Sequence, residues 1–134
     1  MKKLIYPCVV RKEDDIYYAN FPDFNACFTD AESIDELFAN TKEVLNGVIF
    51  TMLKNKMDLP AAGENIKLEE GEFLILVESP VGVIKDRINN MAVKKTLTLP
   101  AWMNEMAMEH DINFSQVLQE GLKRELNIKK TIDT

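Results

Sequence analysis

Cysteine and histidine, the side chains that most often bind zinc, are almost absent from this sequence, as is any disulfide framework. The 134 residues include two cysteines, Cys8 and Cys27, and one histidine, His110. A disulfide scaffold needs more cysteines, and a zinc site needs closer spacing with histidine partners. We therefore expect two packed, reduced thiols in the core, and the sequence implies no metal and no cofactor.

Long apolar runs are also lacking. No segment approaches the roughly 20 apolar residues that span a bilayer. The N-terminus, Met1–Pro7, is basic at first, but the apolar stretch ends by Arg11 and no small-residue cleavage site follows. This pattern does not predict a signal peptide, and we expect a cytoplasmic protein without membrane contact.

The residue sets that carry catalysis are missing as well. The sequence contains no glycine-rich phosphate loop. His110 follows Met106 at helical spacing, which favours a place near a helix end over a role as a catalytic base. We therefore expect no enzymatic activity.

Acidic residues are plentiful, and they are unevenly distributed. The net charge is −6, and the content of 46% hydrophobic and 28% charged residues is typical of a globular protein. Residues 1–90 contain 10 Lys/Arg and 16 Asp/Glu, whereas residues 91–134 contain 6 of each. An acidic first part binds nucleic acid poorly by itself, but it suits a basic protein partner. An acidic surface that only confers solubility is equally compatible.

The first part of the chain predicts an antiparallel meander followed by one long helix. Ser33–Glu36 matches a capping box, and apolar residues then recur every three or four positions from Ile34 to Leu53. Gly47 lies within this stripe, where it disfavours a helix by about 1 kcal/mol relative to alanine, and it would allow close packing on the sheet. The expected elements are strands at 4–11, 16–21, 26–29 and 73–77, and a helix ending near Met57.

Three further segments define the first unit. Pro7 interrupts the first strand and indicates an edge position or a bulge, because proline cannot donate to the ladder. Phe73–Val77 is uniformly apolar, which indicates a strand buried in the sheet. Residues 80–90 mix glycine, charge and Asn-Asn, and we interpret them as a linker.

The second unit is short. Val93–Leu99 alternates between two faces as a strand does, Pro100 suits the first position of a helix, and Asn113 suits the cap of a second helix. One strand and two short helices cannot bury a core alone. We therefore expect dimerisation, in which the strand pairs with that of a second copy. The predicted divisions are a domain at 1–80, a linker at 81–91, a domain at 92–128 and a tail at 129–134.

A ribbon of two such strands would fit the major groove of DNA. Lys94, Thr96 and Thr98 share the outward face, and they comprise a long cation and two hydroxyls. Asn113, Phe114 and Ser115 open the second helix, whose first amides can bind a phosphate. An ordinary amphipathic edge strand has the same pattern, so both interpretations stay open on the pattern alone.

The order of these elements resembles two known modules. Residues 93–126 resemble a ribbon-helix-helix domain, with an alternating strand, Leu99–Pro100, a helix, a polar break and a second helix. The first unit is similar to the HicB antitoxin family through Tyr17–Phe24, Cys27–Thr29 and Ser33–Leu37 before a long helix. The chain departs from the family at Asn25–Ala26, where Pro-Gly is usual, and at Asp111–Ile112, where a glycine is common.

The resemblance implies an α+β protein with a β-β-β-α-β, partial RNase H-like domain and a dimerising ribbon-helix-helix domain. It implies no nuclease activity, and the first strand indeed contains no carboxylate. It further implies that residues 1–80 bind a HicA toxin, a small basic ribonuclease that cleaves mRNA, and that the dimer binds operator DNA and represses the operon. Lys94, Thr96 and Thr98 would then read bases, and residues 113–115 would clamp a phosphate.

No motif fixes the toxin-binding residues. Exposed acids and aromatic anchors are the natural candidates for binding a basic protein. The candidates by charge are Asp23, Glu32, Asp35, Glu36 and Glu43, and the aromatic candidates are Tyr17, Phe21 and Phe24.

Two other functions stay open at this point. The chain could be an orphan ribbon-helix-helix regulator whose first unit senses a ligand or a protein, or a residual nuclease. An adjacent gene for a short basic protein would favour the antitoxin, and metal-dependent RNA cleavage by the purified protein would favour the nuclease.

Overall fold

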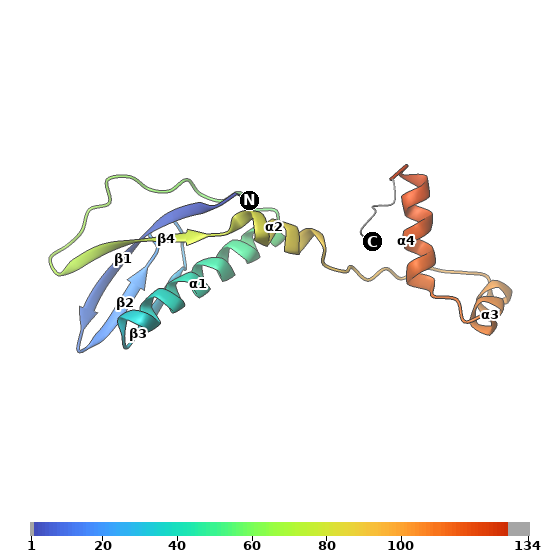
Figure 1. Ribbon diagram of the computed structural model, residues 1–134, viewed down its shortest axis with the longest axis horizontal. Helices are drawn as coiled ribbons and strands as arrows, with labels where there is room; N and C mark the ends of the chain where they lie inside the picture. The colour runs from blue at the N-terminus through green and yellow to red at the C-terminus, as the bar shows by residue number, and fades with distance from the viewer. Residues whose placement is uncertain (1, 129–134) are drawn as a thin grey trace. The chain divides into compact units, whose positions relative to one another are not determined.

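The computed structural model describes residues 2–128, and the predicted tail at 129–134 lies outside this range. The chain divides into two compact units, Met1–Ala92 and Val93–Thr134 (Figure 1). We call these the N-terminal and C-terminal units and describe each by itself.

The N-terminal unit is built on a four-stranded antiparallel sheet with the order β3-β2-β1-β4. Its strands are β1 (Leu4–Glu13), β2 (Ile16–Asn20), β3 (Phe28–Ala31) and β4 (Glu72–Ser79). Strands β1 and β2 are joined by Asp14 and Asp15, which both have a positive φ (50° and 63°). Two such residues form the tight turn that matches the twist of a hairpin, and aspartate tolerates this conformation better than most side chains.

Pro7 lies in an inner strand, not at the edge of the sheet. The ladder between β1 and β2 covers only Val9–Glu13, whereas the ladder between β1 and β4 covers Leu4–Arg11 and places Pro7 opposite Leu76. At the proline, therefore, β1 has a partner strand on one side only. The strand itself is therefore central and not an edge strand, but Pro7 occupies a part of it that has a free side, as a residue without an amide hydrogen requires.

One long helix, α1 (Ile34–Lys54), covers one face of the sheet (Figure 1). Ser33 caps it by accepting a hydrogen bond from the amide of Glu36 at 3.2 Å, as predicted. The carboxylate of Glu36 accepts from the amide of Glu32 at 2.8 Å, one residue before the amide that the capping box specifies. The helix ends three residues earlier than expected and buries one stripe against the sheet: Leu37, Thr41, Leu45 and Ile49.

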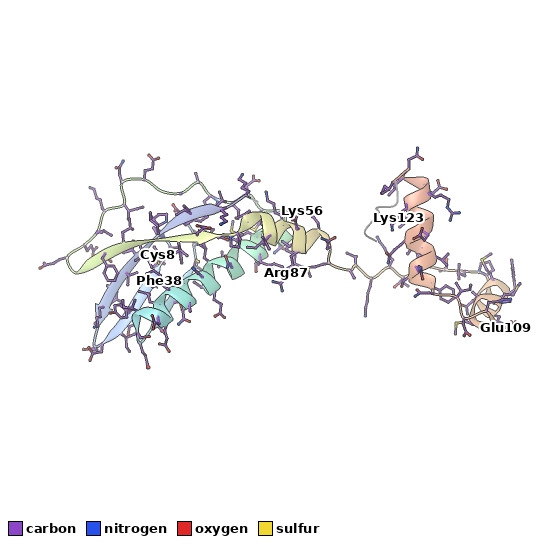
Figure 2. The ribbon with its side chains drawn as sticks, in the orientation of Figure 1. Cys8, Phe38, Lys56, Arg87, Glu109 and Lys123 are labelled. Carbon is purple, nitrogen blue, oxygen red and sulfur yellow. The ribbon has the colours of Figure 1, made fainter. Side chains whose placement is uncertain are left out.

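The core lies between α1 and the sheet, where Cys8 is seen in Figure 2. Tyr6, Cys8 and Val10 point from β1 to this side, since alternate residues of a strand share a face. The Tyr6 hydroxyl donates to the carbonyl of Pro60 at 2.7 Å and fixes the chain that follows α1. Burial, and then the charge of Asp23, raises the pKa of Tyr6 above its ordinary value.

The linker expected at 81–91 is mostly a helix, α2 (Val81–Asn89), so that prediction is wrong. Val81 and Ile84 are buried, and α2 packs against α1. The amide of Gly82 also donates to the carbonyl of Lys2 at 2.9 Å. Val81, Ile84 and Ile88 recur at helical spacing, a signal that the flanking glycine and asparagines obscured. The N-terminal unit therefore extends to Ala92.

The apolar strand β4 occupies an edge of the sheet and is not buried in it, contrary to the prediction. Val77 faces the core, but Leu74 and Leu76 are 41% and 66% exposed on the opposite face. Within residues 2–92, no helix of the N-terminal unit covers that face, which we call the open face. A run of apolar residues thus reflects a strand with a core on one side and an uncovered apolar surface on the other.

The C-terminal unit consists of α3 (Ala101–Glu109) and α4 (Phe114–Glu125), preceded by an extended segment, residues 92–100, without regular structure. The strand predicted at Val93–Leu99 therefore has no partner strand among residues 2–128. Neither helix contains a buried residue. Pro100 immediately precedes α3 and is not its first helical residue.

Candidate functional site

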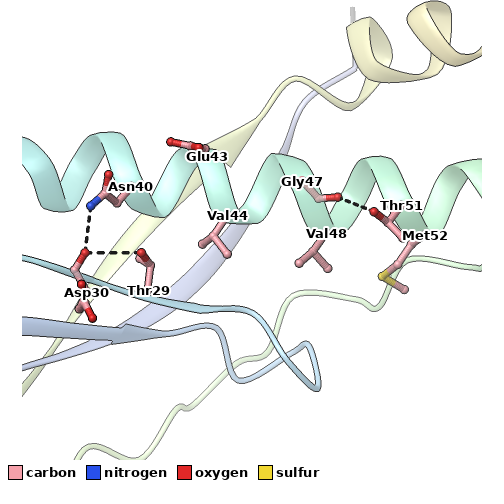
Figure 3. Close-up of a pocket in the computed structure, with 9 residues that line it drawn as sticks. All are labelled: Thr29, Asp30, Asn40, Glu43, Val44, Gly47, Val48, Thr51 and Met52. Carbon is pink, nitrogen blue, oxygen red and sulfur yellow. Dashed lines mark hydrogen bonds between the residues drawn. The ribbon is translucent and has the colours of Figure 1, made fainter.

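A hollow runs between α1 and the edge strand β3 in the N-terminal unit (Figure 3). It has a volume of about 680 Å³ and is open to solvent on one side. We call it the α1–β3 hollow. Its lining residues are Thr29, Asp30, Asn40, Glu43, Val44, Gly47, Val48, Thr51 and Met52.

The floor of this hollow is apolar and its rim is acidic. Val44, Val48 and Met52 point from α1 toward the sheet side in Figure 3 and are half-buried. Asp30 and Glu43 supply the carboxylates of the rim, and none of the nine lining residues is basic. Within residues 2–128, no cation forms an ion pair with either carboxylate. The hollow therefore suits an apolar side chain accompanied by a cation.

A second hollow lies on the other side of the same helix, between α1 and α2. It has a volume of about 380 Å³, and we call it the α1–α2 hollow. The side chains of Phe50, Val83 and Arg87 contribute to its lining. The guanidinium carbon of Arg87 lies 5.7 Å from the centre of the Phe50 ring, a cation–π contact that holds the arginine at this rim.

Gly47 belongs to the lining of both hollows. A Cβ atom added to it would meet nothing within 4 Å, so the expected close packing of Gly47 on the sheet is wrong. The glycine lies on the outer side of α1. It thus forms a low saddle between the two hollows. A glycine in mid-helix is a signal in the sequence, but it was interpreted as packing on the sheet and not as part of a site.

Two of the aromatic candidates for partner binding lie in the core. Phe21 is 0% exposed and Phe24 is 8% exposed, with the Phe24 ring packed edge-on against Tyr6 at 4.8 Å. They cannot serve as surface anchors while the unit is folded. Tyr17 is half-buried, and the amine of Lys12 lies 5.2 Å from its ring centre.

The acidic candidates are on the surface, but they lie apart and several have structural roles. Asp23 accepts a hydrogen bond from the amide of Gly63 at 3.0 Å and holds the loop before β4. Asp35 and Glu36 lie in the first turn of α1, where they suit the positive end of the helix dipole, and Glu32 directly precedes the cap of this helix. Of the predicted acids, Glu43 alone lines the α1–β3 hollow, whereas Asp23 lines a different hollow beside Phe24 and Pro60. Sequence reasoning missed Asp30 and Asn40, which lie on the same rim.

The two cysteines are free and buried, as predicted. Burial, and then the proximity of Cys27, raises the pKa of Cys8 to about 12, and burial raises that of Cys27 to about 11. Both thiols therefore stay protonated near neutral pH, which suits packing and disfavours nucleophilic chemistry. Among residues 2–128, no three acidic, cysteine or histidine side chains are grouped as metal ligands. No helix in that range is long and apolar enough to cross a membrane.

In the C-terminal unit, the structure exposes every residue predicted to contact DNA. Lys94, Thr96 and Thr98 lie in the extended segment, and Phe114 and Ser115 begin α4. Asn113 caps α4 by accepting from the amide of Gln116 at 3.0 Å.

The same unit leaves its apolar residues uncovered. Val93, Leu97 and Leu99 of the extended segment are 79%, 63% and 47% exposed, and large apolar side chains of both helices are also exposed. In the helices these are Trp102, Met103, Met106, Met108, Phe114, Val117 and Leu122. A globular unit with no core of its own requires a partner to cover such a surface.

Comparison with known proteins identifies the family. The family model described as "HicB_like antitoxin of bacterial toxin-antitoxin system" matches residues 6–120, which include most of both units. The chain belongs to the HicB-like antitoxin family. Members of this family are regulatory partners of toxins, so the comparison supports a regulatory and not a catalytic role.

Relatives and solved structures agree with this membership. An uncharacterized 14.9 kDa protein from the rep-hol intergenic region of Haemophilus phage HP1 is 26% identical over 99 residues, which are 73% of this chain and 74% of that protein. A toxin–antitoxin complex from Streptococcus pneumoniae contains a chain with a TM-score of 0.58 and 23% identity, covering 92% of this chain and 99% of that one. The antitoxin HicB of Burkholderia pseudomallei has a TM-score of 0.54 and 18% identity, covering 95% and 99%. These structural likenesses establish the shared fold.

The structure explains both departures of this HicB-like chain from the usual family sequence. Asn25 and Ala26 have no positive φ, so their turn does not require glycine, and the amide of Phe21 closes it on the carbonyl of Cys27 at 2.9 Å. Asp111 has a φ of 52°, the left-handed conformation for which a glycine is favoured. Aspartate tolerates that conformation, so the break between α3 and α4 is preserved.

Proposed function

We propose that this HicB-like antitoxin binds and neutralises a HicA-type ribonuclease that cleaves mRNA, and that it represses its own operon through a dimer of the C-terminal unit. The observation that carries the proposal is the family match across both units. A toxin–antitoxin complex among the similar structures supports the choice of partner.

The N-terminal unit is the proposed toxin-binding part. Residues 1–90 contain 16 acidic and 10 basic residues, and Asp30 and Glu43 stand at the rim of the α1–β3 hollow without an ion-pair partner among residues 2–128. A toxin that binds RNA needs cationic residues, because each phosphate contact displaces a counterion. An acidic surface of this kind would cover them and compete with RNA.

The C-terminal unit is the proposed operator-binding part. Pairing of residues 93–99 from two copies would form the missing strand ladder, and their apolar side chains would cover the exposed surfaces of α3 and α4. The other face of the ribbon would then present Lys94, Thr96 and Thr98 to the major groove. The first amides of α4, at Phe114 and Ser115, would lie ready for a phosphate.

The direct test is to co-express this chain with the short reading frame adjacent to its gene and to tag only that neighbour. We expect a stable complex whose ribonuclease activity is lost relative to the free neighbour. If the neighbour is inert and no complex forms, the antitoxin proposal fails. The alternative, an orphan ribbon-helix-helix regulator with a sensing N-terminal unit, would then be tested by a ligand screen.

Replacing Lys94 by alanine tests the DNA-binding half of the proposal. We expect binding to the DNA upstream of its own gene to weaken by about 1–3 kcal/mol, with a smaller salt dependence, because a cation in the groove is lost. Binding to the toxin should not change. Mobility-shift titrations at several salt concentrations, beside toxin pull-down, measure both effects.

Lys85→Ala is the matched control, since Lys85 is an exposed lysine of α2 in the N-terminal unit. It removes the same charge and should leave operator binding within about twofold of wild type, as expected for a surface change outside the proposed DNA-binding unit. Equal loss of toxin and DNA binding in Lys94→Ala would show that the substitution acts through folding instead.

A further inference from the structure

From the two hollows we infer that an α-helix of the basic toxin crosses α1 at Gly47 and inserts one side chain into the hollow on each side. This inference rests on the proposed function, and it adds the surface and the form of the contact. The surface consists of Gly47 itself, the α1–β3 hollow and the α1–α2 hollow.

The glycine is not required by the folding of this chain. Gly47 is exposed near the middle of a 21-residue helix, and an added Cβ would meet no atom within 4 Å. It has neither a positive φ nor a tight internal contact to explain it. Glycine destabilises a helix interior relative to alanine. Gly47 weakens α1 and has no role in the packing of this chain. A partner whose backbone approaches closely at this point would explain why the position lacks a side chain.

The positions of the hollows fit a crossing helix. Asn40, Glu43, Gly47 and Thr51 recur at spacings of three and four and therefore share the outer ridge of α1. One hollow lies on each side of this ridge, and Gly47 is its lowest point. Side chains seven positions apart on a helix are separated by about 10 Å, close to the diameter of the helix that they would straddle. Helices pack by placing such ridges into grooves.

Charge selects a basic partner over a second copy of this chain. Asp30 and Glu43 line the α1–β3 hollow, and Glu32, Asp35 and Glu36 continue the acidic surface at the start of α1. The cation of the α1–α2 hollow, Arg87, is at the opposite side of the ridge and already contacts Phe50. A second copy whose α1–β3 hollow faced this one would bring two acidic rims together. A toxin helix fits this surface if it carries cations near the α1–β3 hollow and one apolar side chain for each of the two hollows.

The test compares two added leucines on α1. Gly47→Leu fills the saddle, whereas Ala39→Leu adds a leucine at an exposed position of the same helix that lines neither hollow. Both full-length variants are titrated with the tagged neighbour protein by calorimetry, and their thermal unfolding is compared by circular dichroism. We expect Gly47→Leu to weaken binding by at least about 30-fold, as at an interface hot spot, without lowering the midpoint of unfolding. Ala39→Leu should bind within about twofold of wild type.

The outcomes separate this inference from the proposed function. Failure of the wild-type chain to bind the neighbour protein would overturn both. Wild-type binding that Gly47→Leu leaves unchanged would overturn only the crossing at α1, and loss of binding in Leu76→Glu would then place the toxin on the open face. If Gly47→Leu instead changes the oligomeric state of the free antitoxin in analytical ultracentrifugation, the saddle serves a second copy and the inference is wrong.

Discussion

A chain that ends at Ala92 should fold and bind the toxin with unchanged affinity, but it should bind no operator DNA. A chain that ends at Pro80, where the sequence suggested the boundary, should be severely destabilised. The difference between the two truncations is α2, which belongs to the N-terminal unit. The expected result follows from what this helix buries.

Val81 is 1% exposed and Ile84 is 9% exposed in the folded unit. Burial of one such side chain contributes about 1.5–3 kcal/mol, so their removal costs about 3–6 kcal/mol of a total stability of roughly 5–15 kcal/mol. The shorter chain also loses the hydrogen bond from the amide of Gly82 to the carbonyl of Lys2. Urea unfolding followed by circular dichroism gives the two free energies of unfolding directly.

Binding assays with both truncations complete this experiment. Equal stabilities of residues 1–80 and 1–92 would show that α2 does not contribute to the core. Loss of toxin binding by a folded 1–92 chain would show that the C-terminal unit takes part in the toxin interface. Retention of operator binding by that chain would contradict the proposed division of labour.

The second large effect is expected from Phe21→Ala. This ring is fully buried between the sheet and α1, and truncation of a buried phenylalanine costs about 3–5 kcal/mol through lost burial and the cavity left behind. Any loss of toxin binding should therefore follow the unfolded fraction and disappear at lower temperature, where the variant is folded. The free energy of unfolding and the toxin affinity are measured on the same samples at two temperatures.

Phe28→Ala is the matched control, because Phe28 is 66% exposed on β3. We expect this change to alter stability by no more than about 0.5 kcal/mol, the usual range for surface positions. A Phe21→Ala chain that is as stable as wild type but fails to bind toxin would restore Phe21 as a surface anchor.

The sequence predicted those features of the N-terminal unit that depend on residues close together in the chain, such as helix caps and tight turns. Ser33 and the apolar stripe located α1, and the two aspartates at 14 and 15 located the first hairpin. The β4 strand was also located, but its environment was not. A uniformly apolar strand indicates that apolar groups cover both of its faces. The pattern does not show whether the covering groups come from the same chain or from a partner. Phe21 and Phe24 present the same ambiguity, since an aromatic residue serves a core or an interface equally well.

The candidate site was less accessible to sequence reasoning. The α1–β3 hollow depends on the distance between a helix and the edge strand that directly precedes it, and packing sets this distance. Asp30 and Glu43 are 13 positions apart, and no local pattern connects them. Two lining residues carried a signal in the sequence: Glu43 through its charge, and Gly47 because a glycine weakens a helix wherever it lies.

The absence of buried residues in α3 and α4 has a consequence for the proposed repression of the operon. A C-terminal unit that is folded only as a pair gains stability from mass action. At low chain concentration, the amount of operator-competent protein would rise with the square of the total concentration. A twofold dilution, as at cell division, would then reduce that species about fourfold. Repression would then respond more steeply to concentration than neutralisation, if a single N-terminal unit neutralises the toxin as proposed.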